Sequence, residues 1–307
     1  MASPTPKDAP RAFAVFGASV AAPRLEPGLY VVSTPIGNLG DITLRALQTL
    51  AAADVIACED TRVSRVLTNH FAIATRLLAY HDHNAEKQRP KLLQMLADGA
   101  AVALISDAGT PLISDPGLKL VAEALDAGHR VVPIPGASAL LAATVAAGLA
   151  TDTVLFAGFL PNKGGPRKRR IEVLAGIPAS LVFYESPNRL AAGLKDLAEV
   201  LGADRPAAVA RELTKKFETV RRGTLGSLTE AYAGESVKGE IVIVVGPPEE
   251  VAETEIDIDA ALAEALSRSG ASAAAGEVAK ATGRDRRTLY KRAVELKNAA
   301  AVGEGGS

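Results

Sequence analysis

The stretch GLYVVSTPIGNLGDITLRALQTLAA, residues 28–52, contains an apolar run, a glycine-containing loop and a segment with helical periodicity. The apolar run is typical of a strand that is buried on both faces. Gly37 and Gly40 let the backbone turn sharply after this strand, and Asp41 or Thr43 can cap the helix that follows. A strand, a loop and a helix in this order predict the start of a βαβ sheet, in which such loops form the ligand crevice.

The same alternation continues to residue 248 in two series. The first series predicts strands at Leu29–Ser33, Val55–Cys58, Val102–Ser106 and Arg130–Pro133 and helices at Ile42–Ala52, Ala85–Ala97, Gly117–Ala127 and Ser138–Ala147. The second predicts strands at Val154–Ala157, Leu181–Tyr184, Ala207–Ala210 and Glu240–Val245, a helix at Arg189–Leu201 and an antiparallel strand at Phe217–Thr224. We therefore predict an α/β fold with two domains, residues 28–148 and 149–248.

The two ends of the chain differ from this α/β region. Residues 1–27 loosely resemble a short secretory signal, but the run from Ala12 to Ala22 is weakly apolar, so we predict a disordered extension. Residues 249–259 are predicted as an acidic linker, and residues 260–307 as a helical tail with a disordered end. Gly283 and the basic segment after it make this tail similar to a helix-turn-helix. No apolar run reaches the length of about 18 residues that a membrane span needs.

Composition restricts the partners and the compartment. The 34 basic and 35 acidic side chains give a formal net charge of −1, so a nucleic-acid-binding face must be local. Cys58 is the single cysteine, which excludes an intramolecular disulfide and a cysteine-cluster metal site and fits a reducing cytoplasm. His81 and His83 flank Asp82, but no third and fourth ligand pattern accompanies them, so we predict no metal site.

Two more loops follow predicted strands. Residues 106–117, SDAGTPLISDPG, contain two Gly, two Pro and two Asp and suit a tightly folded loop that presents main-chain groups to a ligand. Residues 133–138, PIPGAS, lead into a helix for which Ser138 is a natural N-cap. Because these loops share the carboxyl edge of one sheet, we expect them to converge on one pocket. The absence of a GxGxxG or Walker A pattern disfavours a nicotinamide or nucleoside triphosphate site.

Six motifs in this order together resemble the bacterial ribosomal RNA small subunit methyltransferase I family of the tetrapyrrole-methylase superfamily. They are Thr34–Thr43 (TPIGNLGDIT), Cys58–Arg62 (CEDTR), Ser106–Pro111 (SDAGTP), Ile134–Ser138 (IPGAS), Phe183–Pro187 (FYESP) and Arg211–Lys216 (RELTKK). The resemblance covers roughly residues 28–246 and extends to the tail. It implies the tetrapyrrole-methylase fold, in which two α/β domains hold S-adenosylmethionine in the cleft between them, followed here by the helix-turn-helix-like tail.

The resemblance also implies the residues that contact S-adenosylmethionine, largely through main-chain groups. They are Pro35, Asp107, Ala108, Gly109, Leu112, Ile113, Ser138, Tyr184, Leu213, Gly239, Glu240 and Ile241. Ala108 departs from the superfamily, whose tetrapyrrole enzymes usually carry Pro there, and the loop that begins at Thr34 replaces their glycine-rich loop. These departures are similar to the branch that methylates RNA.

The family resemblance implies 2'-O-methylation of a cytidine in the decoding centre, the P-site region, of 16S ribosomal RNA by a cytoplasmic homodimer. A ribose hydroxyl holds its proton tightly, so a base or a neighbouring cation should assist the transfer. The unranked catalytic candidates are Glu59, Asp60, Arg62 and Glu212. A structural role is the alternative, in which Glu59 and Arg62 pair across one helical turn.

Local positive charge is expected to hold the RNA phosphates. The RNA-binding candidates are Lys163, Arg167, Lys168, Arg169, Arg170, Arg189, Arg211, Lys215, Arg286 and Arg287. The cluster Arg167–Arg170 is predicted to lie in a loop that leads to a helix, or else on a solvated helix face. Two other functions stay open, namely a tetrapyrrole C-methyltransferase of the same fold and a non-catalytic nucleic-acid-binding protein built around the tail.

Overall fold

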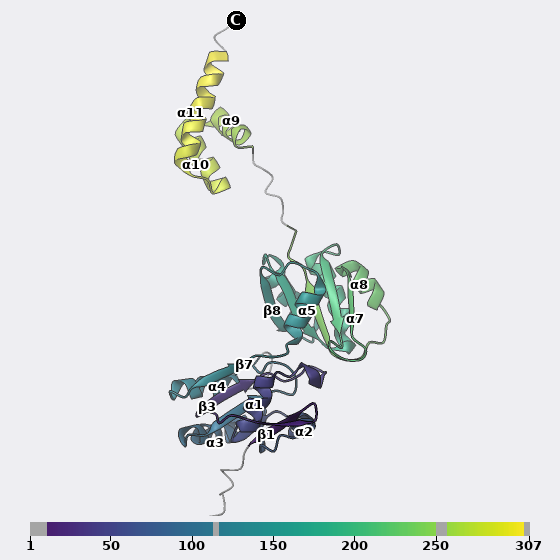
Figure 1. Cartoon of the computed structure of the whole chain (residues 1–307). Coiled ribbons are helices and arrows are strands. Elements are labelled where there is room, and N and C mark those ends of the chain that lie inside the picture. Colours follow the sequence, from purple (N-terminus) through teal and green to yellow (C-terminus); the bar gives the residue numbers. More distant parts are fainter. Residues whose placement is uncertain (1–10, 113–116, 250–256, 304–307) are drawn as a thin grey trace, which may run out of the picture. The chain divides into compact units, whose positions relative to one another are not determined.

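The computed structural model describes residues 11–112, 117–249 and 257–303 (Figure 1). The chain divides into two compact units, Met1–Pro248 and Glu249–Ser307. Both predicted α/β domains thus belong to one unit, and each contributes a separate five-stranded sheet to it. No helix in the described ranges is long and apolar enough to cross a membrane.

The first sheet is parallel, with the strand order β5-β4-β6-β3-β7. Its strands are β3 (Gly28–Val32), β4 (Val55–Cys58), β5 (Leu77–Ala79), β6 (Ala101–Ile105) and β7 (Val131–Ile134), and its helices are α1 (Leu44–Ala52), α2 (Thr61–His70), α3 (Ala85–Ala97) and α4 (Leu118–Asp126). Alternate residues of β4 face opposite layers: Ile56 packs with α1 and α2, and Val55 with α3 and α4. Burial on both faces explains the continuous apolar runs in the sequence.

The second sheet is mixed, with the strand order β11-β10-β12-β9-β8. Its strands are β8 (Val154–Phe159), β9 (Ser180–Glu185), β10 (Pro206–Arg211), β11 (Thr219–Thr224) and β12 (Ile241–Val245), and α6 (Gly164–Ala175), α7 (Leu190–Leu201) and α8 (Leu225–Tyr232) pack on one face. Strand β8 runs parallel to β9, and the other pairs are antiparallel, as predicted for Phe217–Thr224. The sequence did not predict α2, α8 or β5, which are short or strongly polar, and for the region of α6 it predicted a loop that leads to a helix or a solvated helix face.

Helix α5 (Ala139–Ala147) corrects the predicted partition at residue 148. Although α5 follows the last strand of the first sheet, Ala143 and Ala147 pack against Val182, Ala208 and Val242 of the second sheet. The helix is apolar almost all round, but Leu141 and Val145 on another side of it are exposed. The structural division between the two sheets therefore falls before α5, in the loop after β7.

The N-terminal segment also differs from the prediction. Within the expected disordered extension, β1 (Ala12–Val15) and β2 (Ala18–Ala21) form an antiparallel hairpin. Phe13 is buried in the core of the first sheet and Arg11 pairs with Asp54 at 2.7 Å, which attaches the hairpin to the domain. The weakly apolar alternation that resembled a signal is thus a strand pattern. Residues 1–10 lie outside the described residues.

The second unit contains α9 (Ile258–Arg268), α10 (Ala271–Thr282) and α11 (Arg286–Gly303), around a small core of its own. Gly283 ends α10 in the left-handed conformation, at φ 67°, which allows the sharp turn into α11 and agrees with the predicted helix-turn-helix. Asp257 caps α9 through two backbone N–H groups, so the helical region begins before the predicted residue 260. The rest of the predicted linker, 250–256, and the end of the tail, 304–307, lie outside the described residues.

Candidate active site

The loops that follow β3 and β6 are joined at the carboxyl edge of the first sheet. Thr34 and Gly109 exchange two backbone hydrogen bonds, of 2.9 and 3.1 Å. The hydroxyl oxygens of Ser33 and Thr110 lie 3.0 Å apart, and Thr110 donates to the carbonyl of Ala137 in the loop after β7. Because β6, β3 and β7 are neighbours, these bonds bring together the three loops that the sequence predicted to converge.

Asp107 connects the loop after β6 to the loop after β4. Its carboxylate accepts a hydrogen bond of 3.0 Å from the backbone N–H of Asp60. Asp60 in turn caps α2 by accepting from the backbone N–H of Arg62, and pairs with the Arg62 guanidinium at 2.6 Å. These bonds to Arg62 lower the pKa of Asp60 to about 2. Arg62 is therefore paired with Asp60.

A cavity of about 370 Å³ lies at this edge, between the loops of the two sheets. Its lining is mostly apolar and comes from both sheets: Ile36, Ala108, Gly109, Thr110, Ser138, Ala139, Phe159, Tyr184, Glu185, Ser186, Pro187, Leu213, Gly239, Glu240, Ile241 and Val242. This volume is within the range of small-molecule sites, which are mainly apolar with a few polar groups that orient the ligand. The N-terminus of α5 also reaches the cavity, and Ser138 occupies its N-cap position without a side-chain capping bond.

Two glycines bring main chain close to this cavity. Gly109 has φ 81°, and a Cβ atom there would lie 3.2 Å from Ile36. Gly239 has φ 92°, and a Cβ atom there would lie 2.3 Å from a carboxylate oxygen of Glu212. A side chain at Gly239 would therefore be both strained and obstructed, whereas glycine leaves the backbone exposed to a ligand.

Glu212 and Lys215 support the wall behind Gly239. Glu212 accepts from the Lys215 ammonium at 2.8 Å and from the backbone N–H of Glu240 at 3.0 Å, and these bonds lower its pKa. Burial opposes the charge of Lys215, but its bonds to Glu212 and Glu240 outweigh burial and raise its pKa. The side chain of Lys215 also packs on Gly37, where a Cβ atom would lie 2.4 Å away. Lys215 thus links the loop after β3 to the second sheet.

The structure brings most of the predicted cofactor residues to the cavity. Ala108, Gly109, Ser138, Tyr184, Leu213, Gly239, Glu240 and Ile241 line it. Pro35 and Asp107 lie next to lining residues without lining it themselves, and Leu112 packs in the core beside α3 and α4. Ile113 lies outside the described residues. None of the four catalytic candidates lines the cavity, although Glu212 lies directly behind Gly239.

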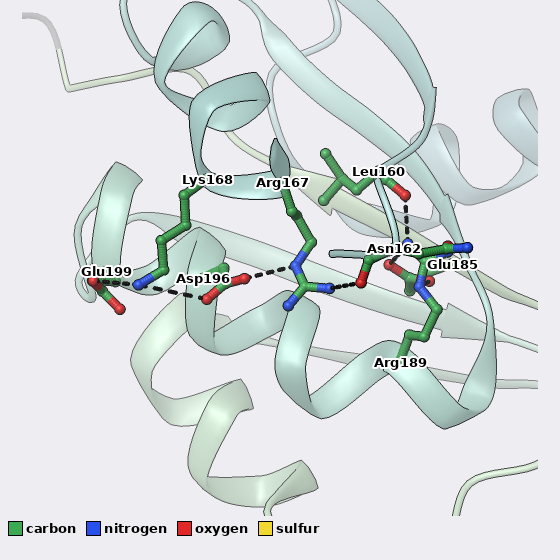
Figure 2. Close-up of polar contacts among 8 residues, drawn as sticks. All are labelled: Leu160, Asn162, Arg167, Lys168, Glu185, Arg189, Asp196 and Glu199. Carbon is green, nitrogen blue, oxygen red and sulfur yellow. Dashed lines mark hydrogen bonds and ion pairs between the residues drawn. The ribbon is translucent and has the colours of Figure 1, made fainter. Parts of the chain in front are cut away.

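The basic cluster is not the loop that the sequence predicted. Arg167–Arg170 lie within α6, and Arg167 is buried, with its guanidinium 2.6 Å from the Asp196 carboxylate (Figure 2). Lys168 pairs with Glu199 at 2.6 Å. Arg167 and Lys168 therefore hold α6 on α7. An amphipathic helix has to bury one face, and in α6 that face includes one of the four basic residues.

Arg189 is also bound internally. Its guanidinium pairs with the buried Glu185 carboxylate at 3.1 Å and donates to the carbonyl of Leu160 and the side-chain oxygen of Asn162 (Figure 2). Glu185 accepts a further bond of 2.7 Å from the backbone N–H of Ser186. Arg189 thus attaches the segment after β8 to the end of β9, which is inconsistent with a free phosphate-binding side chain.

The remaining cations divide into held and exposed groups. Arg211 donates to the backbone carbonyls of Phe217 and Lys238, and Arg286 to Ser272. Four exposed side chains have no hydrogen bond or ion pair with any described residue: Lys163, Arg169, Arg170 and Arg287. Of the ten predicted RNA-binding residues, these four are the ones that the structure leaves open to a phosphate.

Sequence reasoning missed several residues of the cavity. Glu185, Ser186 and Pro187 belong to the FYESP motif, which was noted but not assigned to the site. Phe159 lies eight residues before the basic cluster Arg167–Arg170, lines the cavity and is 55% exposed. The motif was a usable signal for the first three, whereas the orientation of Phe159 depends on a strand irregularity described below.

Comparison with known families gives two matches that agree with this geometry. A family model described as "Tetrapyrrole (Corrin/Porphyrin) Methylases" matches residues 28–229, and one described as "RsmI C-terminal HTH domain" matches residues 252–297. The ribosomal RNA small subunit methyltransferase I of Mesorhizobium japonicum is 57% identical over 92% of this chain and 96% of its own length. The chain belongs to this methyltransferase family. The ribosomal RNA small subunit methyltransferase I of Erythrobacter litoralis is 51% identical over 89% of this chain and 96% of its own length. That of Synechocystis is 45% identical over 87% of this chain and 98% of its own length.

Solved structures confirm the tetrapyrrole-methylase fold. Cobalt precorrin-4 methyltransferase matches with a TM-score of 0.54 at 20% identity, over 71% of this chain and 94% of that one. Uroporphyrin-III C-methyltransferase from Thermus thermophilus, solved with S-adenosyl homocysteine, matches with a TM-score of 0.52 at 21% identity, over 71% and 97%. The predicted α/β fold with a C-terminal helical region is therefore confirmed for this family member.

Proposed function

We propose that this protein transfers the methyl group of S-adenosylmethionine to the ribose 2'-hydroxyl of a cytidine in the decoding centre, the P-site region, of 16S ribosomal RNA. Membership of the family supports methylation of small-subunit ribosomal RNA. The proposal adds the acceptor atom, the ribose 2'-oxygen, and the nucleotide, a cytidine of the decoding centre. The cavity at the carboxyl edge carries the argument, because its size, apolar lining and glycine backbone suit a compact cofactor held mainly by main-chain groups.

The cavity residues would hold S-adenosylmethionine in two ways. Ile36, Leu213 and Val242 offer apolar surface to the adenine, and the N–H groups at the start of α5 suit the carboxylate of the methionine part. When bound, the cofactor supplies a methyl group on a positively charged sulfur. What the chain must add is orientation of the acceptor ribose and exclusion of water, for which a lining of few polar groups is appropriate.

Proton transfer from the hydroxyl limits the roles of the catalytic candidates. Asp60, with a pKa of about 2, and Glu212, with a lowered pKa, are weak bases. Glu59 is half-buried at the end of β4 and stays a candidate base. Lys215 keeps its positive charge behind the cavity wall, and we infer that it favours alkoxide character on the acceptor oxygen.

Exposed cations that follow the cavity residue Phe159 in the chain support a polyanionic acceptor. Lys163 precedes α6, four residues after the cavity residue Phe159, and Arg169 and Arg170 are exposed residues of that helix. Phosphate contacts of this kind position a nucleic acid without reading its sequence. A tetrapyrrole C-methyltransferase would also use cations, but the helix-turn-helix unit has no evident role on a small macrocycle.

The decisive experiment is mass spectrometry of nucleosides and fragments of 16S RNA from a strain that lacks this protein. Loss of ribose methylation at the decoding-centre cytidine, restored by the wild-type gene, is the expected result. Retention of that methyl group would refute the assignment. Calorimetric titration with S-adenosylmethionine tests the non-catalytic alternative, since micromolar binding would eliminate it.

The homodimer and the cytoplasmic location remain predictions that follow from the resemblance. One structural feature supports the homodimer: Leu141 and Val145, one turn apart on α5, have their side chains 63% and 78% exposed. Light scattering after gel filtration would measure the mass in solution, and a monomer at micromolar concentration would contradict the dimer.

A further inference from the structure

Strand β8 contains an irregularity that changes the direction of Phe159. Phe156 is paired with Val182 and Phe159 with Tyr184, so β8 advances by three residues where β9 advances by two. The extra residue is a β-bulge, and Gly158 adopts φ 66° within it. In a regular strand, residues 156 and 159 would point to opposite faces of the sheet. The bulge therefore turns Phe159 to the face that carries Phe156, Tyr184 and the cavity.

The aromatic ring of Phe159 packs against Tyr184 on one side and is open on the other. Its ring centroid lies 5.6 Å from that of Tyr184, with the planes 66° apart, and Tyr184 makes the same kind of edge contact with Phe156 at 4.8 Å. Although Phe159 lines the cavity, its side chain is 55% exposed. An exposed phenyl ring at the edge of a cavity costs hydration free energy in the free protein, whereas Phe156 and Tyr184 are partly buried.

The segment after Phe159 is fixed by Arg189, as Figure 2 shows. The guanidinium binds the carbonyl of Leu160 and the side chain of Asn162, and the buried carboxylate of Glu185 neutralises it at 3.1 Å. The backbone next to Phe159 is thereby held from both sides, by the bulge and by Arg189. A ring held in this way loses little conformational entropy when a flat ligand stacks on it.

We propose that Phe159 is the stacking platform for the base of the nucleotide whose ribose is methylated, and that Arg189 is its positioning residue. The inference rests on the proposed function and deepens it. RNA that is read outside a helix presents splayed bases, and proteins commonly stack these on aromatic rings. Lys163, Arg169 and Arg170 follow Phe159 in the chain, are exposed, and can hold the flanking phosphates of the same strand.

The experiment measures methylation of small ribosomal subunits purified from a strain that lacks this protein, with tritiated S-adenosylmethionine. Phe159→Ala is expected to raise KM for the subunits about 10- to 100-fold with kcat nearly unchanged, because a stacked base is bound equally before and during transfer. Phe159→Trp is expected to keep most of the affinity, and Phe159→Leu to lose it, since leucine has no aromatic face. Phe16→Ala is the matched control, because Phe16 is a fully exposed ring that does not line the cavity.

Arg189→Lys tests the positioning role. It removes the forked contact to Leu160 and Asn162 and should raise KM for the subunits, whereas adding it to Phe159→Ala should have little further effect. Full additivity of the two changes would overturn the positioning role, because Arg189 would then act independently of the ring.

Three results would overturn the stacking role. One is an unchanged KM in Phe159→Ala; the proposed function would survive this. Another is a Phe159→Ala variant that binds S-adenosylmethionine tenfold more weakly by calorimetry while its KM for the subunits is unchanged, which would mean that the ring contacts the cofactor. The third is wild-type protein that leaves the ribose unmethylated, as judged by nucleoside mass spectrometry, which would remove the proposed function as well.

Discussion

Replacing Gly239 by alanine should separate backbone strain from damage to the cofactor site. Gly239 has φ 92°, where an L-residue costs about 1–2 kcal/mol. The new Cβ would lie 2.3 Å from Oε1 of Glu212, whereas ordinary contacts begin at 3.4 Å, so the carboxylate must retreat by 3.4 − 2.3, about 1.1 Å. Such a shift disturbs the bonds from Glu212 to Lys215 and to the backbone of Glu240, both beside the cavity.

Gly234→Ala is the matched control. Gly234 has φ 76°, and a Cβ atom there would meet nothing within 4 Å. It therefore carries a similar backbone strain without the collision and lies outside the cavity lining. Both variants should unfold a few degrees below the wild type, at about 2–4 °C for each kcal/mol.

Affinity for S-adenosylmethionine distinguishes the two variants. By calorimetric titration, Gly239→Ala should bind the cofactor at least about tenfold more weakly than the wild type, which corresponds to about 1.4 kcal/mol. Gly234→Ala should bind it normally. Wild-type affinity in Gly239→Ala, together with the same thermal shift as the control, would refute the reasoning that this glycine shapes the site.

Three further predictions follow from the ion pairs and the division into units. Arg167→Ala should lower the free energy of unfolding by about 3–5 kcal/mol in urea titrations, since it leaves the Asp196 carboxylate buried without its partner. Arg170→Ala should leave stability unchanged and reduce the salt dependence of RNA binding by about one unit of slope. Equal stabilities of the two variants would contradict the assignment of Arg167 to a buried ion pair. Asp60 has its pKa lowered from 3.8 to about 2, so its contribution to stability is complete above pH 4 and disappears as the pH falls through 2. Acid unfolding curves of Asp60→Asn and the wild type should therefore converge toward pH 2, and a constant gap would count against the ion pair. A chain that ends at Pro248 should retain calorimetric affinity for S-adenosylmethionine but lose most methylation of small ribosomal subunits, and full activity would exclude a role of the second unit in RNA binding.

Much of the fold and the cofactor site could be predicted from local patterns. The run AVALI at β6 is apolar because both faces of the strand are buried, and its helix neighbours have helical periodicity. The special residues of SDAGTP mark a loop whose conformation is largely a property of its own backbone. The local pattern predicted that this loop meets a ligand, whereas Ala108 and Gly109, which line the cavity, were named through the family resemblance.

The RNA-binding residues were predicted less well, because charge in a sequence does not specify what a side chain meets. Arg167 and Arg170 are equivalent in the sequence cluster, yet Arg167 is buried against a partner 29 residues away while Arg170 is exposed. A buried cation needs a carboxylate, and only the packing of α6 on α7 supplies one.

The sequence by itself therefore determined the order of most strands, loops and helices and the loops that line the cavity, because periodicity and backbone preference act over a few residues. The family followed from the resemblance of six ordered motifs. The tertiary structure decided three other matters. It packed α5 on the second sheet, it buried Arg167, and through the bulge at Gly158 it turned Phe159 toward the cavity. Each of these depends on the register or packing of elements distant in the chain, and no local pattern carries that information.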